Sequence, residues 1–174
     1  MATATEERLG AMKRRIDHLE QTARTRAAGV TSWLEQYLDN LKHDEASARE
    51  AANREAGAVD EKLEQLRNDL DLAEHRLEAE IAADRQHFTD AVDAELHDWD
   101  VFLERMQAKA ATLSGAERAR AEAAIAVARH LRTDVADAVA AMRSAADERW
   151  NDAKVRVLQS LDDLKRKADA LRKD

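Results

Sequence analysis

An apolar residue recurs at alternating steps of three and four along almost the whole chain, and no proline interrupts the repeat. Because one helical turn takes 3.6 residues, this spacing gathers the apolar side chains into one stripe that faces a neighbouring helix. Charged residues make up 37% of the 174 residues and aromatic residues 3%. This composition is typical of long helices and coiled coils. The sequence therefore predicts an all-α protein built from amphipathic helices.

Glycines mark the predicted helix ends, since proline is absent. Gly57 and Gly115 are the predicted turns, and Ser114 with Glu117 has the spacing of a capping box. These turns give three helices of nearly equal length, at about residues 4–56, 59–113 and 116–172. Equal lengths fit an elongated, antiparallel, coiled-coil-like three-helix bundle. We therefore expect a single elongated helical domain over residues 1–174.

In this register, large residues on two helices face alanines on the third, which keeps each layer at native packing density. We expect small side chains of the last helix to face large ones of the first two. The small residues are Ala119, Ala121, Ala123, Ala124 and Ala126, and the large ones are Leu9, Met12, Ile16, Phe102, Leu103 and Met106. Trp33, Trp150 and Ile81 are predicted to share one layer, and Trp99 also falls on the apolar stripe.

Two alternative architectures stay open, because a single glycine inside a helix costs only about 1 kcal/mol. A break at Gly29, followed by the capping-box spacing of Ser32 and Glu35, makes the bundle locally four-helical. A helix that reads through Gly57 would run for about 110 residues at 1.5 Å each. It would pair with the last helix in a long hairpin that dimerises.

Charge is unevenly distributed along the chain, whose formal net charge is −8. Acidic residues dominate between Asp60 and Asp100, whereas both ends of the sequence carry basic clusters. We interpret this asymmetry as charge complementarity between packed helices. An acidic chain without a clustered basic surface argues against nucleic acid as a partner.

Residues that carry chemistry do not gather in any recognised motif. Cysteine is absent, and no glycine-rich phosphate loop or nucleophile elbow occurs. A di-iron bundle needs repeated Glu-x-x-His pairs. The nearest approximations are Asp84 with His87 and Asp93 with His97. We therefore expect no enzyme activity, no catalytic residue, no cofactor and no metal site.

We expect neither a secretory signal nor a membrane span in this sequence. Its first residues are charged and lack an apolar segment, and no stretch approaches the roughly 18 apolar residues of a membrane span. We therefore expect a cytoplasmic protein without a transmembrane segment.

Three short segments carry a resemblance to a known family. They are Glu95-Leu96-His97-Asp98-Trp99, Arg149-Trp150-Asn151-Asp152-Ala153-Lys154 and Ser160-Leu161-Asp162-Asp163-Leu164-Lys165. Over roughly residues 60–172 the chain resembles a family of small bacterial coiled-coil stress-response proteins. Residues 1–56 and the Ser114-Gly115 turn depart from that pattern. The resemblance implies a stress-related role and no known reaction.

Two functions follow as hypotheses. The first is a non-enzymatic structural or protein-interaction protein whose partner is another helical protein or a second copy. The alternative is a protein of lipid or granule surfaces, similar to phasins or exchangeable apolipoproteins, whose bundle opens to lay its apolar stripe on the surface. A membrane-remodelling helical hairpin is a third reading of the same helix lengths.

Overall fold

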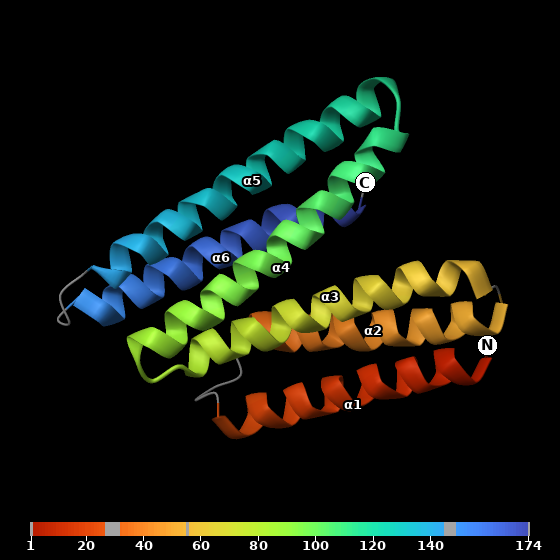
Figure 1. Cartoon of the computed structure of the whole chain (residues 1–174), viewed down its shortest axis with the longest axis horizontal. Helices are drawn as coiled ribbons and strands as arrows, with labels where there is room; N and C mark the ends of the chain where they lie inside the picture. Colours follow the sequence, from red (N-terminus) through yellow and green to blue (C-terminus); the bar gives the residue numbers. More distant parts are fainter. Residues whose placement is uncertain (1, 27–31, 55, 145–148, 174) are drawn as a thin grey trace. The chain divides into compact units, whose positions relative to one another are not determined.

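The computed structural model describes residues 2–26, 32–54, 56–144 and 149–173, and its long elements there are all α-helices (Figure 1). The helices are α1 (Ala2–Arg26), α2 (Ser32–Arg54), α3 (Ala56–Ile81), α4 (Arg85–Thr112), α5 (Gly115–Arg143) and α6 (Trp150–Lys173). The prediction of an all-α protein is confirmed. The chain divides into two compact units, an N-terminal unit of residues 1–81 and a C-terminal unit of residues 82–174.

The N-terminal unit is an up-down-up bundle in which each of α1, α2 and α3 packs on the other two (Figure 1). The predicted apolar stripe forms its core: Leu9 and Ile16 of α1, Leu41 of α2, and Leu63 and Leu66 of α3 are all at most 3% exposed. Burying each such side chain contributes about 1.5–3 kcal/mol. This apolar burial is the main stabilising term of the bundle.

In the C-terminal unit, α5 packs against both α4 and α6. Phe88 and Trp99 of α4, Val135 of α5, and Leu161 and Leu164 of α6 are almost fully buried. The expectation that Trp99 belongs to the core is confirmed, since it is 2% exposed.

Aromatic side chains join the first turns of α4 and α6. The Trp150 ring meets the Phe88 ring edge to face, with centroids 5.3 Å apart. Lys154 Nζ lies 5.4 Å from the Phe88 centroid and donates a 2.8 Å hydrogen bond to the carbonyl oxygen of Ala82. An ammonium group over an aromatic face is attracted by the ring quadrupole.

The prediction of three long helices is wrong, because each predicted helix is divided in two. The helix predicted over 59–113 ends at Ile81, and α4 begins at Arg85 with Asp84 as its N-cap. The helix predicted over 116–172 ends at Arg143, and α6 begins at Trp150. Breaks between helices of about 25 residues allow each unit to fold back on itself, which longer helices would prevent.

The turn predicted at Gly115 is confirmed: α4 ends at Thr112 and α5 begins at Gly115. Gly115 adopts a φ of +57°, in the left-handed region that favours glycine. The predicted capping box does not form. Ser114 occupies the N-cap position, but its side chain makes no capping hydrogen bond.

The outcomes for Gly57 and Gly29 differ. Gly57 lies inside the first turn of α3, because α2 ends at Arg54 and α3 begins at Ala56. The helix that would read through Gly57 is wrong, since α2 and α3 pack side by side. Gly29 lies outside the described residues. Nevertheless, α1 and α2 are separate helices that end and begin on either side of it.

The predicted register of small against large residues does not hold at the start of α5. Ala119, Ala123 and Ala126 are exposed, and Leu9 is instead buried within the α1–α3 unit. The layer predicted for Trp33, Trp150 and Ile81 is not formed as a three-helix layer. Trp150 packs on Phe88, and the side chain of Trp33 lies outside the described residues.

Candidate functional site

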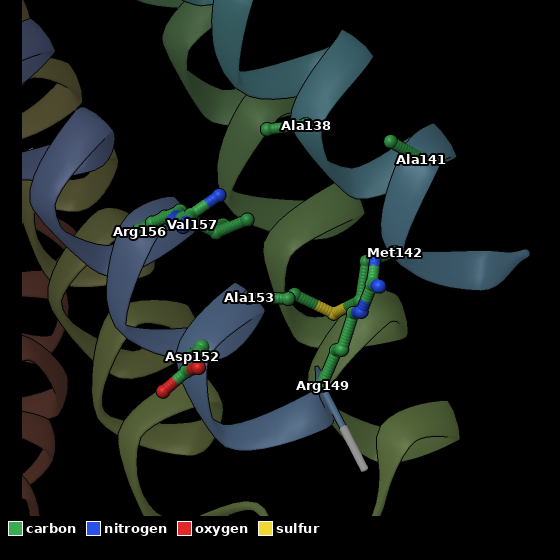
Figure 2. A pocket seen from close by; sticks show the side chains of 8 residues that line it. All are labelled: Ala138, Ala141, Met142, Arg149, Asp152, Ala153, Arg156 and Val157. Carbon is green, nitrogen blue, oxygen red and sulfur yellow. The ribbon is translucent and has the colours of Figure 1, made fainter. Parts of the chain in front are cut away.

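A shallow groove of about 490 Å³ runs between α5 and α6 (Figure 2). Its walls are the small side chains of Ala138 and Ala141 on α5 and Ala153 on α6. Met142, which is 1% exposed, forms part of the floor with its thioether directed toward Ala153. Alanines leave little bulk on the facing ridges, and this explains why the seam between these two helices stays open on its outer side.

Charged residues border this groove. Arg149, Arg156 and Asp152 line it, and all three are exposed. A small ligand in a site is usually enclosed over most of its surface. This groove is open to solvent, and therefore it encloses a small ligand only in part.

Two further grooves lie within the units. One of about 280 Å³ is formed by α4, α5 and the end of α6, with Met106, Leu113, Ile125 and Leu171 among its apolar lining and Arg120 at its border. Another, of about 370 Å³, lies between α1 and α2. Its charged residues are Glu20, Arg24, Glu35, Asp39 and Lys42.

The two acid–histidine pairs considered as metal ligands have other roles. Asp84 Oδ1 accepts a 2.9 Å hydrogen bond from the backbone N–H of His87, and Asp84 Oδ2 lies 2.5 Å from His87 Nδ1. Asp93 forms an ion pair with Arg143 of α5, while His97 is exposed. Among the described residues, no group of three histidine, cysteine, aspartate or glutamate side chains is arranged to hold a metal ion.

The contact between Asp84 and His87 shifts the pKa of both side chains. The hydrogen bond from the His87 side chain is the main cause that lowers the pKa of Asp84 below its ordinary value of 3.8. The same contact with Asp84 raises the pKa of His87 above 6.5. Both groups are exposed. This pair therefore acts as a helix cap at the start of α4.

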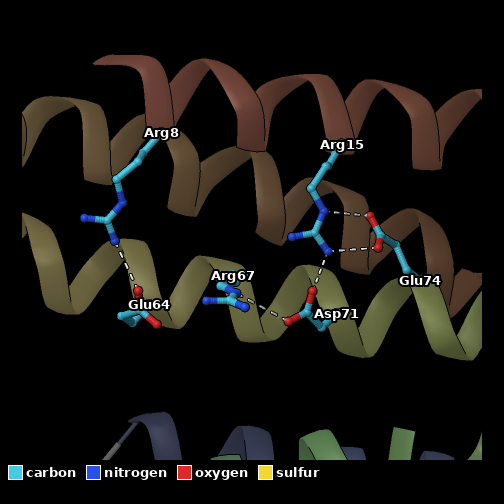
Figure 3. A network of polar contacts seen from close by, with 6 residues as sticks. All are labelled: Arg8, Arg15, Glu64, Arg67, Asp71 and Glu74. Carbon is cyan, nitrogen blue, oxygen red and sulfur yellow. Dashed lines mark hydrogen bonds and ion pairs between the residues drawn. The ribbon is translucent and has the colours of Figure 1, made fainter. Parts of the chain in front are cut away.

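Ion pairs join α1 to α3 in a network of polar contacts (Figure 3). Arg15 of α1 makes a bidentate contact with Glu74 of α3, with Nε 3.0 Å and Nη2 2.8 Å from the two carboxylate oxygens. It also pairs with Asp71, which Arg67 approaches from the same helix. These hydrogen bonds, led by that to Glu74, raise the pKa of Arg15 despite its partial burial.

Arg8 extends the same α1–α3 contact toward the N-terminus of α1. Its guanidinium lies 2.7 Å from Asp60 and 3.1 Å from Glu64. Between α1 and α2, Lys42 Nζ lies 2.9 Å from Glu20, and this hydrogen bond is the main cause that lowers the pKa of Glu20.

In the C-terminal unit, Arg132 and Arg143 of α5 pair with Asp100 and Asp93 of α4. Acids of α3 and α4 thus meet bases of α1 and α5. The expected charge complementarity between packed helices is confirmed for these pairs.

The outer face of α5 was not identified from the sequence. Val127 is 48% exposed there, and Arg120 and Asp134 are exposed on the same face. Because seven residues return to nearly the same side of a helix, these three side chains form one line. The signal was a second series at steps of three and four on this helix, beside the core stripe: Arg120, Ala124, Val127, Leu131, Asp134 and Ala138.

The comparisons with known proteins give no relative: no family model, no curated protein and no solved structure matches the chain. None of the helices in the described ranges is both long enough and apolar enough to cross a membrane.

Proposed function

We propose that this chain is a non-enzymatic structural or protein-interaction protein, which acts through the outer faces of its helices. The stress-related role implied by the resemblance of residues 60–172 belongs to the same proposal. The observation that carries it is the use of the charged side chains. Arg15 of α1 is joined to Asp71 and Glu74 of α3 by ion pairs between the two helices.

The grooves support the same proposal. The groove between α5 and α6 has alanine walls and a border of exposed charges. Such a surface offers close approach to a helix backbone and supplies no nucleophile, general base or oxyanion donor in a defined geometry. An open, low-relief seam is a feature that helix-in-groove recognition uses.

The test is native mass spectrometry of the tagged chain purified from its own cells. We expect the 19.5 kDa chain to be recovered with protein at a fixed stoichiometry, either a further copy or another polypeptide. A small molecule or metal that co-purifies at one equivalent, and is released on denaturation, would contradict the proposal.

The second candidate function, binding to a lipid or granule surface, is favoured by the way α1 closes the N-terminal bundle. Its stripe of Leu9, Met12, Ile16 and Leu19 is buried, while an exposed ion pair of Arg8 and a partly buried one of Arg15 join α1 to α3. If α1 swings out, that stripe becomes available to an interface.

Vesicle flotation separates this candidate from the first. Anionic and neutral vesicles are tested at low salt with the wild-type chain, Arg15→Ala and, as a matched control, Arg24→Ala, whose ion pair lies within α1. Opening of α1 predicts more binding for Arg15→Ala than for the control. If none of the three proteins floats with vesicles, the lipid-surface function is excluded.

A further inference from the structure

The outer face of α5 carries opposite charges at equal distances from an exposed apolar residue. Arg120 precedes Val127 by seven residues and Asp134 follows it by seven. At 1.5 Å per residue, each charge lies about 10.5 Å along the helix from the valine. Leu131, half-exposed, lies four residues after Val127, and the exposed Ala123 lies four before it.

This arrangement is self-complementary. When two copies of α5 are placed antiparallel with Val127 on a two-fold axis, Arg120 of each copy lies opposite Asp134 of the other. Leu131 of each copy then lies opposite Ala123, and the two Val127 side chains meet at the axis. An isologous interface requires this self-complementarity of charge and shape.

We propose that the outer face of α5 is the surface through which two copies of this chain associate, antiparallel and centred on Val127. This inference rests on the proposed function and names its partner as a second copy. The alternating small and large residues allow the two helices to approach closely, as knobs of one helix fit beside alanines of the other.

The charges favour a second copy over another occupant. Within the part of the chain that the structure describes, Arg120 has no ion-pair partner, and Asp134 has only His130, at 3.8 Å. By contrast, Arg132 and Arg143 of α5 pair with acids of α4, and Arg132 lies 2.6 Å from Asp100. The unused pair at positions 120 and 134 has the spacing that a reversed copy of the same helix supplies.

The flanks of this face are open at both ends. The groove that Arg120 borders and the groove that Ala138 borders lie on either side of Val127 along α5. At both places a groove opens beside α5, next to the alanines that line it. Val127 itself is among the most exposed large apolar residues of the described chain.

A charge-swap series tests the arrangement by sedimentation equilibrium. The wild-type chain is expected to approach twice its mass as its concentration rises. Arg120→Asp and Asp134→Arg each place like charges opposite each other, and each is expected to weaken the dimer by about tenfold or more. The double variant Arg120→Asp with Asp134→Arg restores both pairs and is expected to recover the wild-type affinity.

The rescue keeps the test independent of folding. A change that merely destabilised α5 would not be repaired by a second charge reversal, and circular dichroism checks that each variant keeps its helix content. High salt is expected to weaken the wild-type dimer because exposed ion pairs are screened.

A cysteine placed on the axis gives a second readout, since the chain has no cysteine of its own. Val127→Cys is expected to form a disulfide-linked dimer on mild oxidation. The control is Ala141→Cys, exposed on the same helix, because its two copies would lie about 42 Å apart at 1.5 Å per residue. Equal cross-linking of the two variants would indicate random collision and overturn the proposal.

Other outcomes also decide the matter. A wild-type chain that stays monomeric at every concentration overturns the inference, whatever other protein binds it. A dimer that Arg120→Ala strengthens places Arg120 beside a like charge, as a parallel pair does, and this also overturns the inference. If substitutions at positions 120, 127 and 134 leave the dimer affinity unchanged, the α5 face is not the interface, while the proposed function stands. A bound cofactor in the native mass spectrum removes the proposed function itself.

Discussion

Gly115 has a left-handed backbone and Gly10 lies inside a helix. Replacing each with alanine is therefore expected to change the free energy of unfolding in opposite directions. Gly115 has a φ of +57° and open space where a Cβ would lie, so Gly115→Ala costs only the left-handed strain, about 1 kcal/mol of unfolding free energy. Gly10 lies inside α1, where a Cβ would meet Arg14 Nη1 at an ordinary 3.6 Å. Gly10→Ala is expected to raise the free energy of unfolding by about 0.5–1 kcal/mol. Urea unfolding measures both changes, and equal signs would contradict the assignment.

Asp84 is expected to stabilise the start of α4 as its N-cap. Asp84→Ala removes the acceptor for the His87 N–H, and the loss of such a cap destabilises a helix measurably. Asp84→Asn keeps a side-chain oxygen at that place and should retain most of the stability. Ser114→Ala is the matched control, because Ser114 is an N-cap whose side chain makes no capping bond. Thermal unfolding should show a Tm lowered by a few degrees for Asp84→Ala alone.

The Asp84–His87 pair should also show itself in pH titration. Because the pKa of Asp84 is lowered, its contribution to folding stability is lost as pH falls through that lowered pKa. Because the pKa of His87 is raised, its contribution to folding stability is lost as pH rises through that raised pKa. The pair is therefore most favourable between the two. NMR titration should place the pKa of His87 above 6.5 in the wild type and closer to 6.5 in Asp84→Asn. An unchanged His87 titration in the variant would show that Asp84 is not the cause.

At the scale of the element, α1 is tied to α3 by the Arg15 contact, and the strength of that tie can be measured. Arg15→Ala removes a bidentate, partly buried ion pair. Because the side chain is 34% exposed, solvent screening reduces the expected loss to about 1 kcal/mol. Arg24 is itself 71% exposed and pairs within α1, and therefore Arg24→Ala should cost less than about 0.5 kcal/mol. The difference should shrink in high salt, and a salt-independent loss would instead indicate lost packing.

The apolar stripes predict the helices but not all of their ends. Gly115 is predictable because a left-handed position favours glycine. The break before α4 has neither glycine nor proline in Ala82, Ala83 and Asp84. Its local signal is an acid three residues before His87, a spacing that serves an N-cap as well as a pair of metal ligands. The structure adds a tertiary contact at this break, since Lys154 of α6 donates a hydrogen bond to the carbonyl oxygen of Ala82.

The sequence predicts that acids and bases of neighbouring helices meet, but it does not predict which residues pair. The acidic middle of the sequence indicates that bases pack against it, and Arg15 with Glu74 does so. Which base meets which acid depends on the fold of three short helices, which the expected register of three long helices does not contain. That register also does not predict the α5 face, because it buries Ala119 and Ala123 against other helices, whereas both are exposed in the structure.

At the scale of the whole molecule, the division into two units predicts that damage to one core stays local. Leu41→Ala in α2 creates a cavity in the N-terminal unit and should cost about 2–5 kcal/mol. Hydrogen exchange should then accelerate at amides of α1–α3 while α4–α6 keep their protection. Leu161→Ala in α6 should give the reverse pattern. Acceleration spread evenly over both units in either variant would show that the chain unfolds as one body.

The local pairing of the helices also has a consequence for how the chain is made. Within each unit a helix packs mainly on the helix next to it in the sequence, as α2 does on α3 and α5 does on α4 and α6. Low contact order of this kind gives folding in microseconds to milliseconds. Synthesis at about 5–20 residues per second takes several seconds more to complete the polypeptide. The first three helices therefore have time to assemble at the ribosome before the last three exist.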